Sequence, residues 1–146
     1  MSTERPAQDR RDSYRHFRRI TTRWMDNDAY GHVNNVVYYS WFDTVVNEYL
    51  VAHGVLDISG GEVIGLVVET QCRYFSELAF PQPVDLGLRV GKLGNSSVRY
   101  EIGVFAEGED AASAQGHFIH VYVDRAERRP TPLPAPLRAA LEKIHA

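Results

Sequence analysis

Hydrophobic and polar residues follow two different periods along this chain. Residues 17–25 alternate with period two and place Ile20 and Trp24 on one face, which predicts a strand. From Asn34 to about Ala52 the spacing of the apolar residues becomes helical. Two adjoining series of apolar residues show this helical spacing: Val37, Trp41 and Val45, and then Phe42, Val46, Tyr49 and Leu50. Because few polar positions remain in the first two turns, we expect a helix that is covered on most sides.

Beyond residue 61 the chain returns to period two in four stretches separated by turn-forming residues. The stretches are 63–75, 84–93, 98–104 and 114–124. The pair Gly94–Asn95 is typical of a tight turn, so we expect a hairpin there, within an antiparallel meander. Near the end of the chain, helical spacing behind a proline predicts a short closing helix. Its residues are Pro136, Leu137, Leu141 and Ile144.

These elements predict an α+β fold in which a curved antiparallel sheet wraps around one long helix. At 146 residues the chain has the size of one domain, and it contains no internal repeat. A sheet of this kind has open edges, and proteins usually cover or pair their edge strands. We therefore expect a homo-oligomer, as a dimer or a dimer-based tetramer.

The N-terminal residues differ in charge from the rest of the chain. Residues 1–20 contain six arginines and three acidic residues, a local charge of +3 in a chain whose net charge is −3. Since the first part of this stretch has no apolar periodicity, we predict a flexible basic arm over residues 1–15 and a single folded domain over residues 16–146. Deleting residues 1–12 is expected to leave activity largely intact.

The overall composition argues against several classes of function. A net charge of −3 and a hydrophobic content of 44% offer no bulk attraction for nucleic acid. No stretch approaches the roughly 18 continuous apolar residues of a membrane span, and no secretory signal pattern is present. The lone Cys72 cannot form an internal disulfide, which favours a cytoplasmic location. Because it lies within a strand-like pattern, we expect Cys72 to be structural rather than nucleophilic.

A polar segment, "DNDAYGHVNN", stands immediately before the predicted helix. A calcium loop would use Asp26 and Asp28, but its last ligand would be Val37, which has no oxygen in its side chain. A zinc site would need histidines that converge, whereas His117 and His120 project from opposite faces of a strand. We therefore predict no metal site.

Two interpretations of the segment remain. Aspartate, asparagine and glycine are the residue types that turns and helix caps require in any protein. The same residues also suit an acidic catalytic loop, because the first N–H groups of a helix have no partners within the helix. A carboxylate beside such N–H groups combines a base or nucleophile with a site that stabilises an oxyanion. The residue types alone leave both interpretations open.

The order of residues in "RWMDNDAYGHVNNVVYYSWFDTVVNEYL" resembles one known family. Its pattern D-x-D-x-x-G-H-V-N-N-x-x-Y is similar to that of the hotdog-fold acyl-CoA thioesterases, in the branch of 4-hydroxybenzoyl-CoA thioesterase and acyl-CoA thioester hydrolases. Three further segments occur in the order that this family shows: the strand end from Tyr74 to Pro81, "LGNSS" at 93–97 and "VDRAERRPTPLP" at 123–134. The resemblance covers nearly the whole chain after the arm and implies the fold that the periodicities predict.

The resemblance implies an acyl-CoA thioesterase, and it implies roles for particular residues. Asp28 corresponds to the catalytic carboxylate, acting as nucleophile or general base, and the backbone N–H of Asn35 corresponds to the oxyanion donor. Asp26 corresponds to an acid that shapes the loop. Substrate-binding positions are implied at Tyr30, Gly31, His32, Asn34, Tyr38, Glu69 and Thr70, the last two acting across a dimer interface. A thioester needs no metal or redox cofactor for this chemistry, so we expect none.

Coenzyme A would bring phosphates, for which basic side chains near the pocket mouth are candidate ligands. These are Lys92, Arg99, Arg125, Arg128 and Arg129. The alternative functions are a hydroxyacyl-thioester dehydratase of the same fold, with His32 as its histidine, and a non-catalytic acyl-thioester binding module. The acyl group stays open, because residues such as Tyr38 and Trp41 suit an aryl pocket or a fatty-chain tunnel equally. The choice between coenzyme A and an acyl carrier protein also stays open.

Overall fold

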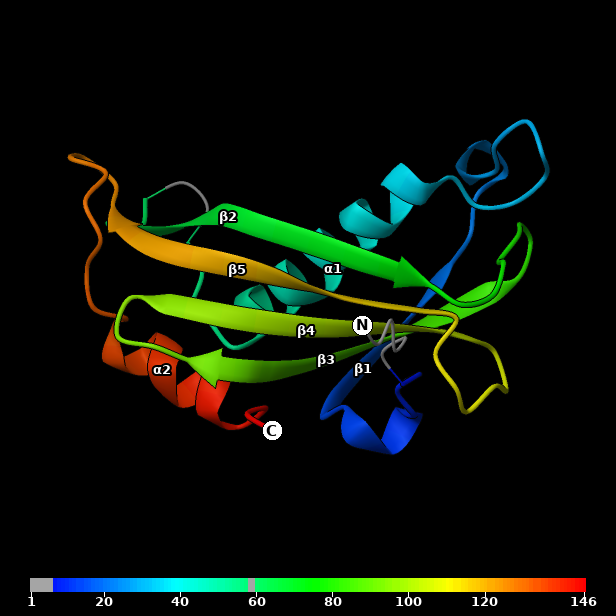
Figure 1. The fold of residues 1–146 in the computed structure, drawn as a ribbon. Coiled ribbons are helices and arrows are strands. Elements are labelled where there is room, and N and C mark those ends of the chain that lie inside the picture. Colours follow the sequence, from blue (N-terminus) through cyan, green and yellow to red (C-terminus); the bar gives the residue numbers. More distant parts are fainter. Residues whose placement is uncertain (1–6, 58–59) are drawn as a thin grey trace, which may run out of the picture.

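The computed structural model describes residues 7–57 and 60–146, and these residues form the predicted α+β fold (Figure 1). The strands are β1 (His16–Thr21), β2 (Val63–Tyr74), β3 (Pro83–Leu93), β4 (Ser97–Ala106) and β5 (Ala114–Asp124). The helices are α1 (Asn35–Ala52) and α2 (Ala135–Glu142), with short 3-10 turns η1 (Arg11–Ser13) and η2 (Trp24–Asp26). The long helix and the closing helix lie where the spacing of apolar residues predicts them.

All neighbouring strands of the sheet are antiparallel, in the order β1-β3-β4-β5-β2. The predicted meander is therefore correct for β3, β4 and β5. It is wrong for β2, which pairs with β5 at an edge, because residues 75–82 carry the chain across the end of the sheet before β3 begins. The edge position of β2 matters for the site described below.

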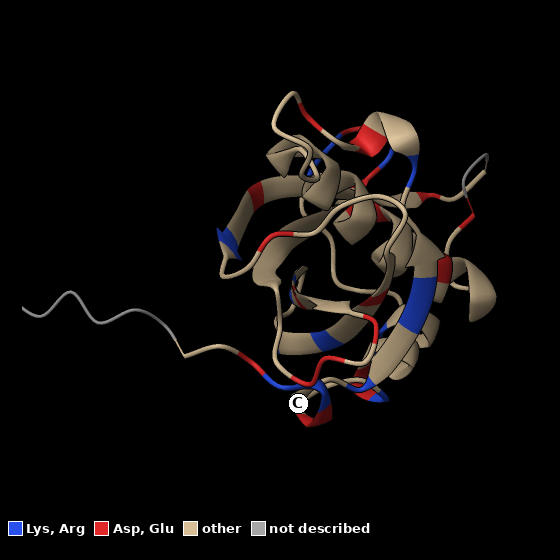
Figure 2. Ribbon diagram, turned by 90° about the vertical axis from the view of Figure 1, so that its right-hand side faces the viewer, with Lys and Arg blue, Asp and Glu red and all other residues tan. Residues whose placement is uncertain are grey.

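The core lies between α1 and the concave face of the sheet, and the sheet curves when it is viewed from its end (Figure 2). Phe42, Val45 and Val46 of α1 are fully buried against it. Burying a side chain of this kind contributes about 1.5–3 kcal/mol, so α1 is held mainly by packing. This packing fixes where the first turn of α1 lies relative to β2.

The first strand is shorter than predicted. Strand β1 ends at Thr21, and Trp24 lies in η2 with 77% of its surface exposed. The strand pattern fails here because the Thr22 hydroxyl donates a hydrogen bond to the carbonyl of Gln82 at 2.8 Å, and the chain then turns at Arg23. The turn delivers Asp26 to the start of the candidate loop.

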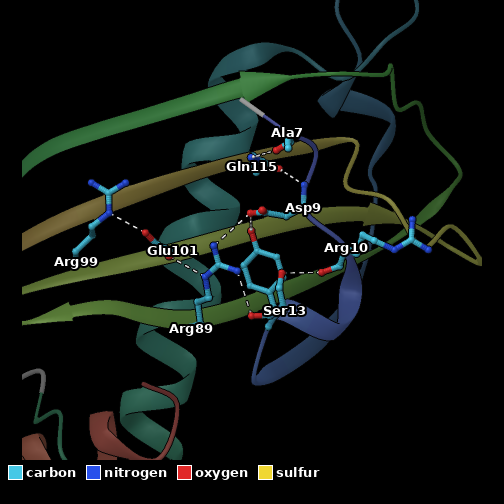
Figure 3. A network of polar contacts seen from close by, with 9 residues as sticks. Ala7, Asp9, Arg10, Ser13, Arg89, Arg99, Glu101 and Gln115 are labelled. Atoms are coloured by element: carbon cyan, nitrogen blue, oxygen red, sulfur yellow. Dashed lines mark hydrogen bonds and ion pairs between the residues drawn. The ribbon is translucent and has the colours of Figure 1, made fainter. Parts of the chain in front are cut away.

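The N-terminal segment also differs from the expectation. Residues 7–15 of the predicted arm lie against the convex face of the sheet (Figure 3), where the Tyr14 side chain is buried. The Tyr14 hydroxyl donates a hydrogen bond to Asp9 at 2.8 Å. The Tyr14 ring lies against Gly103, where a methyl group on residue 103 would come within 2.6 Å of the ring. Arg11 pairs with Asp85 of β3 at 2.9 Å. Residues 1–6 of the predicted arm lie outside the described residues.

The distribution of charged residues and the length of the helices bear on nucleic-acid binding and membrane insertion, the functions that the composition argues against. On the side of the molecule shown in Figure 2, acidic and basic residues are interspersed, without a face of one sign. Neither helix in the described part of the chain is long and apolar enough to cross a membrane.

Candidate active site

Asp26 holds together the loop that precedes α1. Its side chain is 1% exposed, and one carboxylate oxygen accepts a hydrogen bond from the Arg23 backbone N–H at 2.7 Å. The other oxygen accepts two hydrogen bonds from the Arg23 guanidinium, at 2.9 and 3.0 Å. The Asp26 carbonyl accepts from the N–H of Asn34 at 2.8 Å, which ties the start of the loop to its end. Asp26 therefore shapes the loop.

Asp28 lies at the tip of this loop with one oxygen engaged. Its Oδ1 accepts hydrogen bonds from the backbone N–H groups of Tyr30 at 2.8 Å and His32 at 3.4 Å. Gly31 has a φ of +84°, a conformation that residues with side chains rarely adopt, and it lets the chain reverse below the carboxylate. Among the described residues no group donates to Oδ2, so this oxygen is available to a reactant.

The first turn of α1 presents an unpaired N–H group. Asn34 caps the helix, since its Oδ1 accepts from the N–H of Val36 at 3.1 Å and its carbonyl accepts from that of Val37 at 3.0 Å. The N–H of Asn35 has no acceptor within the described chain. It lies at the positive end of an 18-residue helix, where it can stabilise negative charge on an oxygen atom.

Asp28 and Asn35 line the same cavity, which has a volume of about 420 Å³. The rest of its wall comes from the loop, α1 and the segment after β2: Tyr30, His32, Val33, Tyr38, Tyr74, Phe75, Ser76, Glu77 and Leu78. His32 closes one side, with Nε2 at 3.0 Å from the Glu77 carboxylate. A cavity with a carboxylate and a free N–H donor can act on a carbonyl carbon while binding the carbonyl oxygen.

Aromatic side chains form the inner wall of this cavity. The Tyr74 hydroxyl donates to the carbonyl of Asn35 at 3.2 Å, and the Tyr38 and Tyr74 rings meet edge to face with centroids 4.9 Å apart. Burial raises the pKa of Tyr38 to about 12 and that of the nearby Cys72 thiol to about 11. Both groups are therefore protonated at neutral pH, and Cys72 lacks the thiolate that a nucleophile needs.

Several wall residues were not predicted to belong to the site. The sequence places Tyr74, Glu77 and Leu78 in the segment 74–81 that carries the family resemblance, but it predicts no role in the site for any of them. They reach the cavity because the chain leaves β2 beside the first turn of α1, where the carbonyl of Leu78 accepts a hydrogen bond from the N–H of Val33 at 2.8 Å. No local pattern signals a contact between segments so far apart in sequence.

Two predicted substrate-binding residues lie elsewhere in this chain. Glu69 points to the convex face, where its carboxylate is 2.6 Å from Nε2 of the buried His117, and Thr70 is exposed on β2. Neither lines the Asp28 cavity. Both lie on the edge strand, so their predicted role across a dimer interface stays a prediction.

The candidate phosphate ligands are likewise remote from Asp28 within one chain. Arg99 lies on β4 and donates to Glu101 at 2.8 Å, and Lys92 is exposed on β3. Arg128 and Arg129 are exposed in the loop after β5. That loop (orange) and the Asp28 loop (light blue) lie at opposite ends of the molecule (Figure 1).

Metal-binding groups do not converge in the described part of the chain, where no cluster of three or more histidine, cysteine or acidic side chains could hold an ion. His117 and His120 point to opposite faces of β5, since His117 pairs with Glu69 on the convex face while His120 packs against Tyr100 in the core.

The fold and the cavity together define a class of protein: a hotdog domain with an acidic loop at the start of its central helix. Comparison with known families agrees. The model of the thioesterase-like superfamily matches residues 22–141, and the chain belongs to that superfamily.

Solved structures show the same fold. The PA5185 protein of Pseudomonas aeruginosa strain PAO1 is 55% identical, with a TM-score of 0.93 over 96% of this chain and 98% of that one. The PA2801 protein of Pseudomonas aeruginosa, a proposed thioesterase, is 32% identical, with a TM-score of 0.79 over 87% of this chain and 98% of that one. A 1,4-dihydroxy-2-naphthoyl-CoA thioesterase from Synechocystis is similar in fold at 16% identity, with a TM-score of 0.79 over 86% and 93% of the two chains.

Proposed function

We propose that this protein hydrolyses an acyl-CoA or aroyl-CoA thioester to the free acid and coenzyme A. The observation that carries the proposal is that the open Oδ2 of Asp28 and the unpaired N–H of Asn35 belong to one cavity. Membership of the thioesterase-like superfamily supports the reaction class. Thioester hydrolysis needs these two groups and water, without a metal or redox cofactor.

In this mechanism the thioester carbonyl oxygen binds to the N–H of Asn35. The Asp28 carboxylate then attacks the carbonyl carbon directly, or it removes a proton from a water molecule that attacks. Negative charge develops on the carbonyl oxygen, and the N–H at the positive end of α1 stabilises it. The thiolate of coenzyme A leaves. When Asp28 has acted as a base, the thiolate takes up the proton that Asp28 removed from water. When Asp28 has attacked directly, the acyl group remains on Asp28 as an anhydride, and water then hydrolyses this anhydride to the free acid, restores the carboxylate and supplies the proton for the thiolate. His32 and Tyr30 hold the loop around Asp28 through their backbone N–H groups.

The proposed active unit is a dimer in which two β2 strands pair. Strand β2 is an edge strand of 12 residues, and Leu66, Val67 and Val68 on it are exposed, Val68 by 61%. An apolar edge of this length is a template for pairing with another strand, and a second copy offers the same surface by symmetry.

Antiparallel pairing of β2 would also bring the loop after β5 of one subunit, which contains Arg128 and Arg129, to the Asp28 cavity of the other. The loop after β5 adjoins the start of β2, where the N–H of Arg125 donates to the carbonyl of Glu62 at 2.8 Å. The Asp28 cavity adjoins the end of β2 through Tyr74. Since antiparallel strands place start against end, Arg128 and Arg129 approach the cavity of the other subunit, where they can bind the phosphates of coenzyme A.

The test is release of free thiol from a panel of CoA thioesters that varies in chain length and aromaticity. We expect hydrolysis of at least one class, and we expect Asp28→Asn to lower kcat by about 10²–10⁴, the usual cost of losing a positioned base. The variant should stay folded, because asparagine retains the oxygen that accepts from Tyr30 and His32.

Asp43→Asn is the matched control. Asp43 is an exposed carboxylate on α1, and its side chain makes no hydrogen bond or ion pair within the described residues. This variant should keep the parental rate. If wild-type protein binds thioesters without releasing thiol, it is a binding module, and if it hydrates enoyl thioesters instead, it is a dehydratase.

A further inference from the structure

A second cavity lies beside the C-terminal half of α1. Its volume is about 350 Å³, and it is bounded by α1, the segment that follows α1, the start of β2 and the end of β5. Much of its wall is apolar, from Leu50, Leu56, Ile64 and Tyr122. Its polar and charged lining residues are Asn47, Asp57, Arg125 and His120. The mechanism described above uses none of these residues.

His120 is buried without a hydrogen-bond partner. The residue is 5% exposed, and Nε2 is enclosed with no donor or acceptor nearby in the described chain. The surrounding rings do not supply one: the hydroxyl groups of Tyr100 and Tyr122 hydrogen-bond to each other at 2.6 Å, and Phe118 stacks on the imidazole. Nε2 has almost no accessible surface, so a ligand in the cavity would not reach it. Nδ1 has no hydrogen-bond partner in the described chain either, and proteins rarely leave such a group unpaired, so this nitrogen at the cavity wall indicates a place for a ligand group.

The position of the ring indicates which atom would contact a ligand. Nδ1 faces Gly65, which also lines the cavity, and a methyl group at Gly65 would come within 3.2 Å of Nδ1 and 2.9 Å of the Tyr122 ring. The absence of a side chain at residue 65 therefore keeps this part of the wall open.

The charge of the ring limits the kind of ligand group that can pair with His120 itself. Burial lowers the pKa of His120 to about 4, so the imidazole is uncharged at neutral pH. A neutral imidazole has one donor and one acceptor nitrogen, and a hydroxyl group can pair with whichever of the two it meets. The apolar wall around it suits a hydrocarbon chain.

The place of the cavity indicates how an acyl chain would reach it. Within one chain, Asn47 of this cavity lies about 18 Å along α1 from Asn35, at 1.5 Å per residue. In an antiparallel pair of β2 strands that overlap along their full length, Val63 lies opposite the other strand's Tyr74. The His120 cavity at the start of β2 then adjoins the Asp28 cavity of the partner at the end of β2.

We propose that the His120 cavity of one subunit binds the distal acyl chain of the thioester that Asp28 of the partner subunit attacks, and that His120 selects acyl chains carrying an uncharged hydroxyl group. The proposal rests on the proposed thioesterase function and on the pairing of β2. It makes His120 a specificity-determining residue, distinct in place from the groups that act on the carbonyl.

The first experiment measures kcat/KM for hydroxyacyl-CoA thioesters and for their unsubstituted counterparts of equal length, in wild-type protein and in His120→Phe. We expect wild type to have the higher kcat/KM for the hydroxylated chain. In His120→Phe the ratio of kcat/KM for hydroxylated over unsubstituted chains should fall about tenfold, which is the effect of losing one hydrogen bond. His16→Phe is the matched control, since His16 also carries an unpaired buried Nε2 but lies on β1, outside this cavity. Equal preferences in wild type and His120→Phe would overturn the proposal.

A binding experiment separates failure of this proposal from failure of the proposed function. Free hydroxy fatty acids should raise the melting temperature of wild type more than plain fatty acids do, and this difference should vanish in His120→Phe. If no thioester is hydrolysed but this difference is seen, the hydrolase function is wrong and the His120 site stands. If thioesters are hydrolysed and the difference is absent, the function stands and the His120 site is overturned.

A third experiment tests the crossing of subunits by co-expressing two inactive variants. Asp28→Asn removes the carboxylate, and Leu56→Trp fills the cavity, with Ile64→Phe as a second filling variant if Leu56→Trp does not fold. A mixed dimer retains one intact site only if each site takes its carboxylate and its cavity from different subunits. Random pairing should then restore about a quarter of wild-type activity. Absence of recovery in dimers shown to be mixed would overturn the cross-subunit arrangement.

Discussion

The two aspartates of the loop have different environments, which predicts different effects of the same substitution. Asp26 is 1% exposed and accepts three hydrogen bonds from Arg23, whereas Asp28 is half-buried at the loop tip. Asp26→Asn should lower the free energy of unfolding by about 1–3 kcal/mol, because it removes charge-assisted bonds from a buried site. Chemical denaturation measures this effect, and Asp28→Asn should change stability by much less. Equal effects of the two substitutions would contradict this reading of the loop.

His120 predicts a pH dependence of stability. The pKa of its imidazole is lowered to about 4 in the folded protein from an ordinary value of 6.5, because of burial. Between these values the unfolded chain binds a proton that the folded protein does not, so stability should fall as the pH falls from about 6.5 to 4. Denaturation at several pH values should show a shallower fall in His120→Phe. His16, whose pKa burial also lowers, is present in both proteins, so the difference between them isolates His120. Parallel profiles would contradict the assignment.

At the scale of elements, Asp85 joins the N-terminal segment and β1 to β3. Its carboxylate pairs with Arg19 of β1 at 2.8 Å and with Arg11 of η1 at 2.9 Å. The hydrogen bond from Arg19 is the main reason that the pKa of Asp85 lies below its ordinary value of 3.8, with Arg11 adding to it and burial opposing it. Asp85→Asn should therefore destabilise the fold by about 1–3 kcal/mol at neutral pH.

The stabilisation that Asp85 provides through Arg11 and Arg19 should be lost in acid. Because the folded pKa is lowered, the stabilisation is fully present above about pH 4 and is lost as the pH falls through the folded pKa. The gap in unfolding free energy between wild type and Asp85→Asn should thus narrow below that pH. A gap that stays constant down to strong acid would show that the effect of Asp85 comes from packing and not from its charge.

At the scale of the whole molecule, the edge of β2 predicts the link between assembly and activity. Val68→Lys places a charge on an exposed edge position, which disfavours strand pairing. Light scattering should report a shift from dimer to monomer, with loss of thioesterase activity and a retained circular dichroism spectrum. Ala139→Lys adds the same charge at an exposed position of α2, remote from β2, and should change neither property. An active Val68→Lys monomer would show that one chain holds a complete site.

Much of the candidate site could be predicted because it is local in sequence. Asp28, Gly31, Asn34 and Asn35 occupy one short segment, and turn and capping chemistry act over two to four residues. Tyr74 and Glu77 could not be predicted in the same way, because they come from a segment about forty residues away. Their place depends on where β2 ends relative to α1, which no pattern within either segment encodes.

The amino-acid sequence by itself determined the elements and the shape of the loop before α1, because helical and strand periods are properties of neighbouring residues. Only the tertiary structure decided three other features: the pairing of β2 with β5, the docking of residues 7–15 on the convex face, and the enclosure of His120 without a partner. Each depends on competition between segments distant in sequence. The apolar stripe of β2 suits more than one neighbour, and Tyr14 becomes a buried anchor only where Gly103 leaves room for its ring.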